Sequence, residues 1–287
     1  MATTVVDIDH LREWIGKTES REDRITLAPM AALSATLDRD DPFPRDGDAL
    51  PPLWHWLYFL PIHRQSELGP DGHPKRGSFI PPVPLPRRMF AGGRQQFHRP
   101  LRAGEEISRV SRIADVTHKM GRNGPLVFVL VRHEISNRHG LALVEEHDIV
   151  YRESLRQGEA VQHPQPAPVN AAWSREVLAD AVVLFRYSAL TFNPHRIHYD
   201  LRYCTDVEGY PGLVVHGPLI ATLLADLLRR NIPEARVTHF SFRAVRPLFD
   251  THSFSVNGRA ASDGKTVKLW ARDHEGWLCM EAAATLA

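Results

Sequence analysis

Residues 218–230, PLIATLLADLLRR, have the pattern of an amphipathic helix. Leucine and isoleucine recur at intervals of three and four residues, which places them on one face of a helix. Pro218 suits the first turn, because the N–H group that proline lacks would be unpaired there in any case. The pattern therefore predicts one helix with a single apolar face, made of Leu219, Ile220, Leu223, Leu224, Leu227 and Leu228.

Strand-like segments follow this helix at 237–243, 251–260, 266–272 and 278–286. The turns at 262–264 and 273–276 contain glycine, as expected of antiparallel hairpins. A comparable series occurs earlier, at 93–101, 107–118, 126–135 and 141–151, with turns at 102–104, 121–124 and 137–140. Upstream of it, the apolar and aromatic segment 53–60 either begins a buried helix or forms a short core strand.

The repeated order predicts an α+β duplication in which each half wraps a curled antiparallel sheet around one central helix. This is the hotdog arrangement used twice, a double hotdog. Six prolines between Pro70 and Pro86 predict an extended, irregular loop, and the segment HPQPAP at 163–168 predicts a stiff linker. We therefore divide the chain into an N-terminal hotdog at 1–160, a proline-rich linker at 161–170 and a C-terminal hotdog at 171–287.

The composition excludes several classes of protein. With 287 residues, 43% hydrophobic and 24% charged, the chain is neither disordered nor collagen-like. The 35 Lys and Arg nearly balance the 34 Asp and Glu, so we expect neither nucleic acid nor a membrane surface as a partner. Two cysteines, Cys204 and Cys279, exclude a disulfide framework. A signal-peptide pattern and a long uncharged run are both missing, which predicts a cytoplasmic protein.

The densest polar cluster lies between Tyr187 and Asp200. His195 and His198 offer a base near physiological pH, Asn193 offers an amide to orient water, and Asp200 offers a carboxylate to hold an imidazole tautomer. A polar turn and a zinc site are the alternatives. The strict zinc helix signature is absent and Pro194 disfavours a regular helix, so we predict a catalytic cluster without metal.

A second cluster, EGYPGLVVHGPL at 208–219, leads directly into the predicted helix. Free N–H groups at a helix N-terminus can stabilise a developing oxyanion, and Gly217 allows a carbonyl to approach closely. Such a donor contributes roughly 3–4 kcal/mol to a transition state. The chain has no Gly-x-Ser-x-Gly elbow, phosphate-cradling loop or dinucleotide fingerprint. The two clusters therefore favour proton chemistry next to a thioester carbonyl over nucleophilic, redox or kinase chemistry.

At these clusters the sequence resembles the MaoC-like hydratases, or hydratase 2 enzymes, which have a hotdog fold and a His-Gly pair ahead of the central helix. It is most similar to the mesaconyl-CoA and itaconyl-CoA hydratases and the type 2 hydroxyacyl-thioester dehydratases. The matching segments are FRYSALTFN at 185–193, HRIHYD at 195–200 and GYPGLVVHGPL at 209–219. Earlier matches, PRRMFAGG at 86–93 and GPLVFV at 124–129, correspond to that family's degenerate first hotdog.

The resemblance implies roles for individual residues. The general hydratase motif, Asp-x-Asn-Pro-x-His, is not reproduced: aligned on Asn193, its aspartate falls on Thr191, and aligned on His198 it falls on Asn193. We therefore expect His198 to be the base that handles the water proton, with Asn193 orienting the water. His195 or Asp200 would supply the second proton-handling group. His216 and Gly217 would bind substrate, with the Gly217 N–H at the thioester oxygen.

The N-terminal half would then act as a lid and acyl pocket. Arg87, Arg88 and Arg94 lie beside glycines and are expected either to meet CoA phosphates or a substrate carboxylate, or to be solvated surface residues. Trp54 and Trp56 are expected in the core.

The predicted function is reversible addition of water to the double bond of a short enoyl-CoA, branched or dicarboxylic in the mesaconyl- and itaconyl-CoA cases. No cofactor is implied, since CoA is part of the substrate. Two alternatives remain: a 3-hydroxyacyl-carrier-protein dehydratase, and a non-catalytic subunit that binds acyl thioesters. A duplicated chain can pair its hotdogs internally, so we expect either a monomer or a homodimer.

Overall fold

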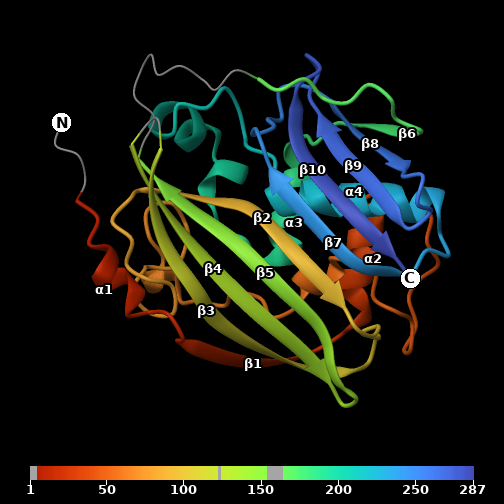
Figure 1. The fold of residues 1–287 in the computed structure, drawn as a ribbon, viewed down its shortest axis with the longest axis horizontal. Coiled ribbons are helices and arrows are strands. Elements are labelled where there is room, and N and C mark those ends of the chain that lie inside the picture. The colour runs from red at the N-terminus through yellow and green to blue at the C-terminus, as the bar shows by residue number, and fades with distance from the viewer. Residues whose placement is uncertain (1–4, 122–123, 154–163) are drawn as a thin grey trace.

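The computed structural model describes residues 5–121, 124–153 and 164–287. Within them, ten strands form one sheet in the order β1-β3-β4-β5-β2-β7-β10-β9-β8-β6 (Figure 1). The strands are β1 Thr18–Arg24, β2 Arg87–Phe97, β3 Glu106–Gly121, β4 Gly124–Asn137, β5 Gly140–Arg152, β6 Trp173–Val177, β7 Val237–Ala244, β8 Phe254–Ala260, β9 Thr266–Arg272 and β10 Leu278–Leu286. The α-helices are α1 Ile8–Arg12, α2 Leu27–Thr36, α3 Ala181–Thr191 and α4 Gly217–Asn231. Four short helical turns are η1 Trp54–Leu57, η2 Gln65–Glu67, η3 Arg196–His198 and η4 Tyr203–Val207.

The sheet consists of two five-stranded halves, as expected of the predicted double hotdog. The halves are not separate sheets, however, because β2 pairs antiparallel with β7 and joins them edge to edge. Figure 1 shows these two strands side by side at the middle of the sheet. At the junction a Cβ on Gly92 would lie 2.6 Å from the carbonyl oxygen of Phe242, so a side chain there would force the two strands apart.

Helix α4 is the central helix of the second half, as predicted. It packs against β6, β8, β9 and β10, and Leu219, Ala221 and Leu224 are completely buried. In the first half, α2 follows β1 as α3 follows β6; it packs against α3 and η1, and its Met30 and Leu33 belong to the same hydrophobic cluster. Figure 1 shows α2, α3 and α4 on one face of the sheet.

The sequence did not predict α1, α2, α3, β1 or β6. The apolar segment 53–60 contains only the short turn η1, because Leu53 and Phe59 both adopt left-handed backbone conformations that interrupt a helix or strand. The proline-rich segment 70–86 is irregular, as predicted, and its Val83 and Leu85 are buried beside β3, β4 and β5 in a second cluster.

Parts of the predicted joints, residues 122–123 and 161–163, lie outside the described residues. The remainder of the predicted linker is extended, and Pro166 forms an isolated antiparallel bridge with Trp277. In the described ranges, no helix combines the length and apolar character needed to cross a bilayer. The domain boundary and the choice between monomer and homodimer stay predictions.

A buried ionic network ties the segment after α2 to α4. Arg39 bonds to Asp41 at 2.9 Å and to Asp226 on α4 at 2.7 Å, and Arg229 reaches Asp41 at 3.1 Å. Burial raises the pKa of the Asp41 carboxyl, but the hydrogen bonds from Arg39 and Ser34 and the charge of Arg229 outweigh it and lower the pKa to about 2. The network thus stabilises contact between the two halves while Asp41 is ionised.

This network predicts a loss of stability in acid. Because the folded-state pKa of Asp41 lies below its unfolded value of 3.8, its contribution is complete above pH 4 and lost as the pH falls through about 2. We expect Asp41→Asn to lower the free energy of unfolding by about 1–2 kcal/mol at pH 7, and by less at pH 3. Urea unfolding of both proteins at the two pH values measures this, with Asp9→Asn as a surface control. A deficit of equal size at both pH values would contradict the assignment.

Candidate active site

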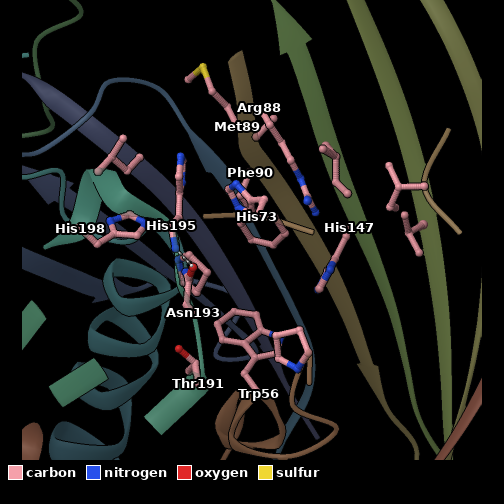
Figure 2. A pocket seen from close by; sticks show the side chains of 18 of the residues that line it. Trp56, His73, Arg88, Met89, Phe90, His147, Thr191, Asn193, His195 and His198 are labelled. Atoms are coloured by element: carbon pink, nitrogen blue, oxygen red, sulfur yellow. Dashed lines mark hydrogen bonds between the residues drawn. The ribbon is translucent and has the colours of Figure 1, made fainter. Parts of the chain in front are cut away.

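A cavity of about 640 Å³ is lined by residues from both halves of the chain. Side chains from the end of α3, from η3 and from the start of α4 form one side. Residues of the proline-rich loop, η1, β2 and β5 form the other. Figure 2 shows His198, His195, His73 and His147 across this cavity, with Phe90 and Trp56 between its walls.

The end of α3 sets the position of the predicted catalytic cluster. Asp180 caps the start of α3, and the helix ends where Phe192 adopts a left-handed conformation with φ 48°. Pro194 prevents the helix from continuing. The Asn193 side chain then accepts a hydrogen bond from the His195 N–H at 3.0 Å, which shapes the turn leading into η3. Asn193, His195 and His198 all line the cavity.

His198 is held in one tautomer. Its Nδ1 lies 2.7 Å from the carbonyl oxygen of Val214, so Nδ1 carries the proton and donates it. Its Nε2 makes no hydrogen bond within the described residues and is left to accept a proton. Burial lowers the pKa of His198 to about 4, which keeps the ring neutral at pH 7.

His216 does not contact the cavity, contrary to its predicted role in substrate binding. Its side chain is completely buried, stacks on His198 with ring centroids 3.6 Å apart, and bonds to Ser188 Oγ through Nε2 at 2.8 Å. It therefore supports the His198 ring from behind. The next residue, Gly217, does line the cavity as the first residue of α4, and its N–H has no acceptor among the described residues.

His195 faces two residues that the sequence analysis did not single out. Its ring centroid is 4.0 Å from that of His73, whose Nδ1 lies 3.1 Å from Asp71 Oδ2. Burial lowers the pKa of both imidazoles below the usual value. One atom each of Asp71, His73 and His195 lie within 4.8 Å of one another, so these three side chains could hold a metal ion.

Asp200 does not belong to the cavity, which corrects its predicted catalytic placement. Its Oδ2 accepts hydrogen bonds from Arg196 at 3.0 and 2.7 Å, and its Oδ1 accepts one from the Tyr203 N–H at 3.0 Å. These bonds cap the helical segment after η3. The carboxylate is therefore engaged in bonds that shape the local fold and does not line the cavity.

The three predicted arginines have different surroundings. Arg87 lines the cavity but is paired with Glu208 at 3.0 Å. Arg94 lies outside it, half exposed and paired with Glu146 and Asp148. Arg88 lines the cavity, and within the described residues it has no hydrogen-bond or ion-pair partner. Figure 2 shows its side chain reaching from β2 into the cavity between His73 and His147.

The cavity wall from the first half is polar as well as aromatic. Glu145 on β5 is buried and accepts hydrogen bonds from Trp56 Nε1 at 2.8 Å and Gln95 Nε2 at 2.9 Å. Its carboxylate also lies 3.0 Å from His55 Nε2 and 2.8 Å from His147 Nε2. Burial raises the pKa of Glu145, but these two imidazoles outweigh burial and hold the pKa well below its usual range.

Asp71, His73 and the Glu145 group were not predicted from the sequence. Glu145 and His147 occupy alternate positions of a predicted strand, and charged residues on a strand's inner face are a signal for a polar site. Asp71-Gly72-His73 stands inside the proline-rich segment, where an acid, a glycine and a histidine in succession were visible. Trp54 is buried in the core as predicted, whereas the partly buried Trp56 packs against the core and also lines the cavity.

Comparison with known proteins identifies the family. Residues 53–250 match the family described as hydroxyacyl-thioester dehydratase type 2. The chain belongs to this family. It is 49% identical over 276 residues to the mesaconyl-C(4)-CoA hydratase of Chloroflexus aurantiacus. The aligned region covers 95% of this chain and 96% of that protein. The predicted resemblance to this group of dehydratases is confirmed.

Solved structures confirm the fold of this dehydratase family member. A MaoC-like dehydratase from Phytophthora capsici superimposes with a TM-score of 0.67 at 12% identity, over 98% of each chain. A conserved hypothetical protein of Mycobacterium tuberculosis with a double hotdog fold superimposes with a TM-score of 0.57 at 14% identity, covering 95% of this chain and 96% of that one. The double hotdog prediction is therefore confirmed.

Proposed function

We propose that this chain is a hydro-lyase that adds water reversibly to the double bond of a short enoyl-CoA whose acyl group carries a second carboxylate. One observation carries the proposal: three functional groups line the same cavity. They are the neutral His198, the N–H of Gly217 and the guanidinium of Arg88, and the last two have no hydrogen-bond partner in the described residues. The similarity to a mesaconyl-C(4)-CoA hydratase supports the same substrate class. CoA enters as part of the substrate, and we propose no cofactor and a cytoplasmic location.

The proposed chemistry follows from the two groups on the second half of the chain. As the water oxygen bonds to the β-carbon, its proton passes to Nε2 of His198, which is free to accept it. The electrons of the double bond move toward the thioester oxygen and form an enolate. The Gly217 N–H at the start of α4 donates a hydrogen bond to that oxygen, and the positive end of the helix dipole adds to the stabilisation. The Asn193 side chain would orient the water.

Arg88 is proposed to bind the second carboxylate. A partly buried guanidinium that lines the cavity without a protein partner in the described residues favours an anionic ligand, since its planar donors match a carboxylate. The other cavity arginines have partners. Arg21 bonds to the carbonyl of Leu60, Arg76 to those of Val83, Leu85 and Pro86, and Arg87 to Glu208. Arg109 lies 3.9 Å from Glu19, and Arg246 lies 3.9 Å from both Asp273 and Glu275. The polar wall around His147 and Glu145 also suits a polar acyl end better than a long alkyl chain.

The test is hydration of a small panel of enoyl-CoA esters, followed by loss of the absorbance of the conjugated thioester. We expect mesaconyl- and itaconyl-type CoA esters to be hydrated with a kcat/KM at least tenfold above that of crotonyl-CoA. Failure of the folded protein to hydrate any of the three esters would contradict the proposal. A parallel assay with the same acyl groups on acyl-carrier protein separates the CoA enzyme from a carrier-protein dehydratase.

A further inference from the structure

The cavity contains a carboxylate that could replace the aspartate missing from the family motif. Thr191 and Asn193 stand at the motif positions, and Asp200 is bonded to Arg196 outside the cavity. Three other carboxylates that line the cavity pair with other cavity residues: Glu19 with Arg21, Glu145 with His55 and Glu208 with Arg87. The remaining cavity carboxylate, Asp71, is bonded to an imidazole that faces the catalytic cluster.

Asp71 and His73 have the geometry of an acid–base pair. The carboxylate accepts hydrogen bonds from both Nδ1 of His73 at 3.1 Å and the backbone N–H of His73 at 3.0 Å. This fixes the tautomer and leaves Nε2 of His73 without a protein partner in the described part of the chain. A carboxylate in this position orients the ring and stabilises the imidazolium formed when Nε2 takes up a proton. His198, bonded to a neutral carbonyl, lacks that support.

The loop that carries this pair is fixed against the catalytic cluster of the second half. The Arg196 N–H donates to the carbonyl oxygen of Asp71 at 2.9 Å, and the Arg196 side chain donates to that of Pro70 at 3.0 Å. Gly72 has φ +91°, and a Cβ built on it would lie 1.9 Å from the carbonyl oxygen of Pro194. The contact is so close that only glycine fits, which keeps His73 against His195.

We propose that His73, held by Asp71, carries the proton transfer at the α-carbon, while His198 carries the transfer at the water. The assignment rests on the proposed hydratase function and adds the residue that function lacks. Figure 2 shows His198, His195 and His73 in succession along the cavity, with His195 between the two proton-handling rings. The ring centroids of His195 and His198 are 5.5 Å apart, and those of His195 and His73 are 4.0 Å apart.

The proton balance requires the two rings to hold one extra proton between them. In hydration, the hydroxyl of water bonds to the β-carbon, and the other proton of the water passes to Nε2 of His198. The α-carbon of the enolate then takes the proton from Nε2 of His73, so H and OH have been added and no electrons are gained or lost. The proton left on His198 returns to His73 through solvent. In dehydration, neutral His73 removes the α-proton and Asp71 stabilises the resulting charge, while protonated His198 gives its proton to the hydroxyl that leaves the β-carbon as water.

The experiment measures dehydration of the 3-hydroxyacyl-CoA product with hydrogen or deuterium at the α-carbon. We expect Asp71→Asn and His73→Gln to lower kcat about 10- to 100-fold. Both should raise the α-deuterium isotope effect on kcat, because cleavage of the α-carbon bond becomes slower than the other steps. His198→Gln should lower kcat without raising that isotope effect. A purely structural role for the loop would not separate the variants in this way.

Gly72→Ala tests the placement of the loop without altering either side chain. We expect it to reproduce the lower kcat and the raised isotope effect, because its Cβ displaces the loop from Pro194. Gly77→Ala is the matched control: Gly77 also has a positive φ, of +99°, but a Cβ there meets nothing closer than 3.7 Å. It should therefore cost some stability and leave the isotope effect unchanged.

Three outcomes would overturn the inference. Wild-type kcat in both Asp71→Asn and His73→Gln would exclude a role in proton transfer. A reduced kcat with an unchanged isotope effect would assign these residues a structural role. Activity that disappears on dialysis against a chelator and returns with Zn²⁺ would make Asp71, His73 and His195 a metal site instead. In each case the wild-type enzyme still turns over substrate, whereas a wild type inactive on every ester would overturn the proposed function itself.

Discussion

His198→Gln is expected to lower kcat for hydration of the carboxylated enoyl-CoA by about 1000-fold, with little change in KM. Glutamine fills most of the imidazole volume and places an amide near the position of Nε2. It has no lone pair basic enough to accept the water proton, however, so the loss falls on the chemical step and not on binding. Initial rates at saturating substrate, together with a full KM determination, measure both effects.

The control for this variant is His118→Gln on β3. His118 is exposed, and its side chain makes no hydrogen bond, ion pair or ring contact within the described residues, so the same substitution there should leave kcat within twofold of the wild-type value. Thermal unfolding checks that His198→Gln is folded, since His216 would lose its stacking partner. A folded variant that retains a kcat near that of the wild type would remove His198 from the mechanism.

Most of the fold followed from periodicity, because buried faces leave a repeating pattern in the sequence. The strands predicted at 266–272 and 278–286 have the observed bounds of β9 and β10. Strand β1, TESREDR, is polar throughout because it is an edge strand that pairs only with β3, so no pattern marked it. Helix α2, LAPMAALSAT, carries apolar residues all around its axis and therefore shows no amphipathic period.

The site could be predicted only where it is local in sequence. His198, Asn193 and Gly217 lie within one continuous stretch of about 25 residues and could be assigned from their spacing. Asp71 and His73 lie more than 100 residues earlier, and their arrival beside His195 depends on the contact between Gly72 and Pro194. Such a tertiary contact leaves no period in either segment. This is why the sequence offered only residues near His198 in the chain, His195 or Asp200, for the second proton-handling group.

An irregularity in β2 explains why the facing of two arginines could not be predicted from the sequence. Arg88 and Arg94 are six residues apart, so on a regular strand both would point to the same face of the sheet. The register of β2 against β5 shifts between Phe90 and Gly92, and this bulge reverses the facing of the residues beyond it. Arg88 therefore enters the cavity, whereas Arg94 points to the outer face and pairs with Glu146 and Asp148.

Arg88→Gln is expected to change substrate preference. If Arg88 binds the second carboxylate, the variant should lose about 100- to 1000-fold in kcat/KM toward mesaconyl- or itaconyl-type CoA esters, because that carboxylate would be buried without a cation. Crotonyl-CoA has no such group, so its kcat/KM should change less than threefold. The measurement is the ratio of the two kcat/KM values in each protein, which does not depend on the fraction of active enzyme.

Arg94→Gln is the matched control, because it makes the same substitution on the same strand but outside the cavity. It should leave the ratio of kcat/KM values unchanged. Equal losses for both substrates in Arg88→Gln would contradict carboxylate recognition and assign Arg88 to the CoA phosphates, which all the esters share. A selective loss would instead mean that one residue of β2, on the cavity side of the strand, determines which acyl groups the second half of the chain hydrates.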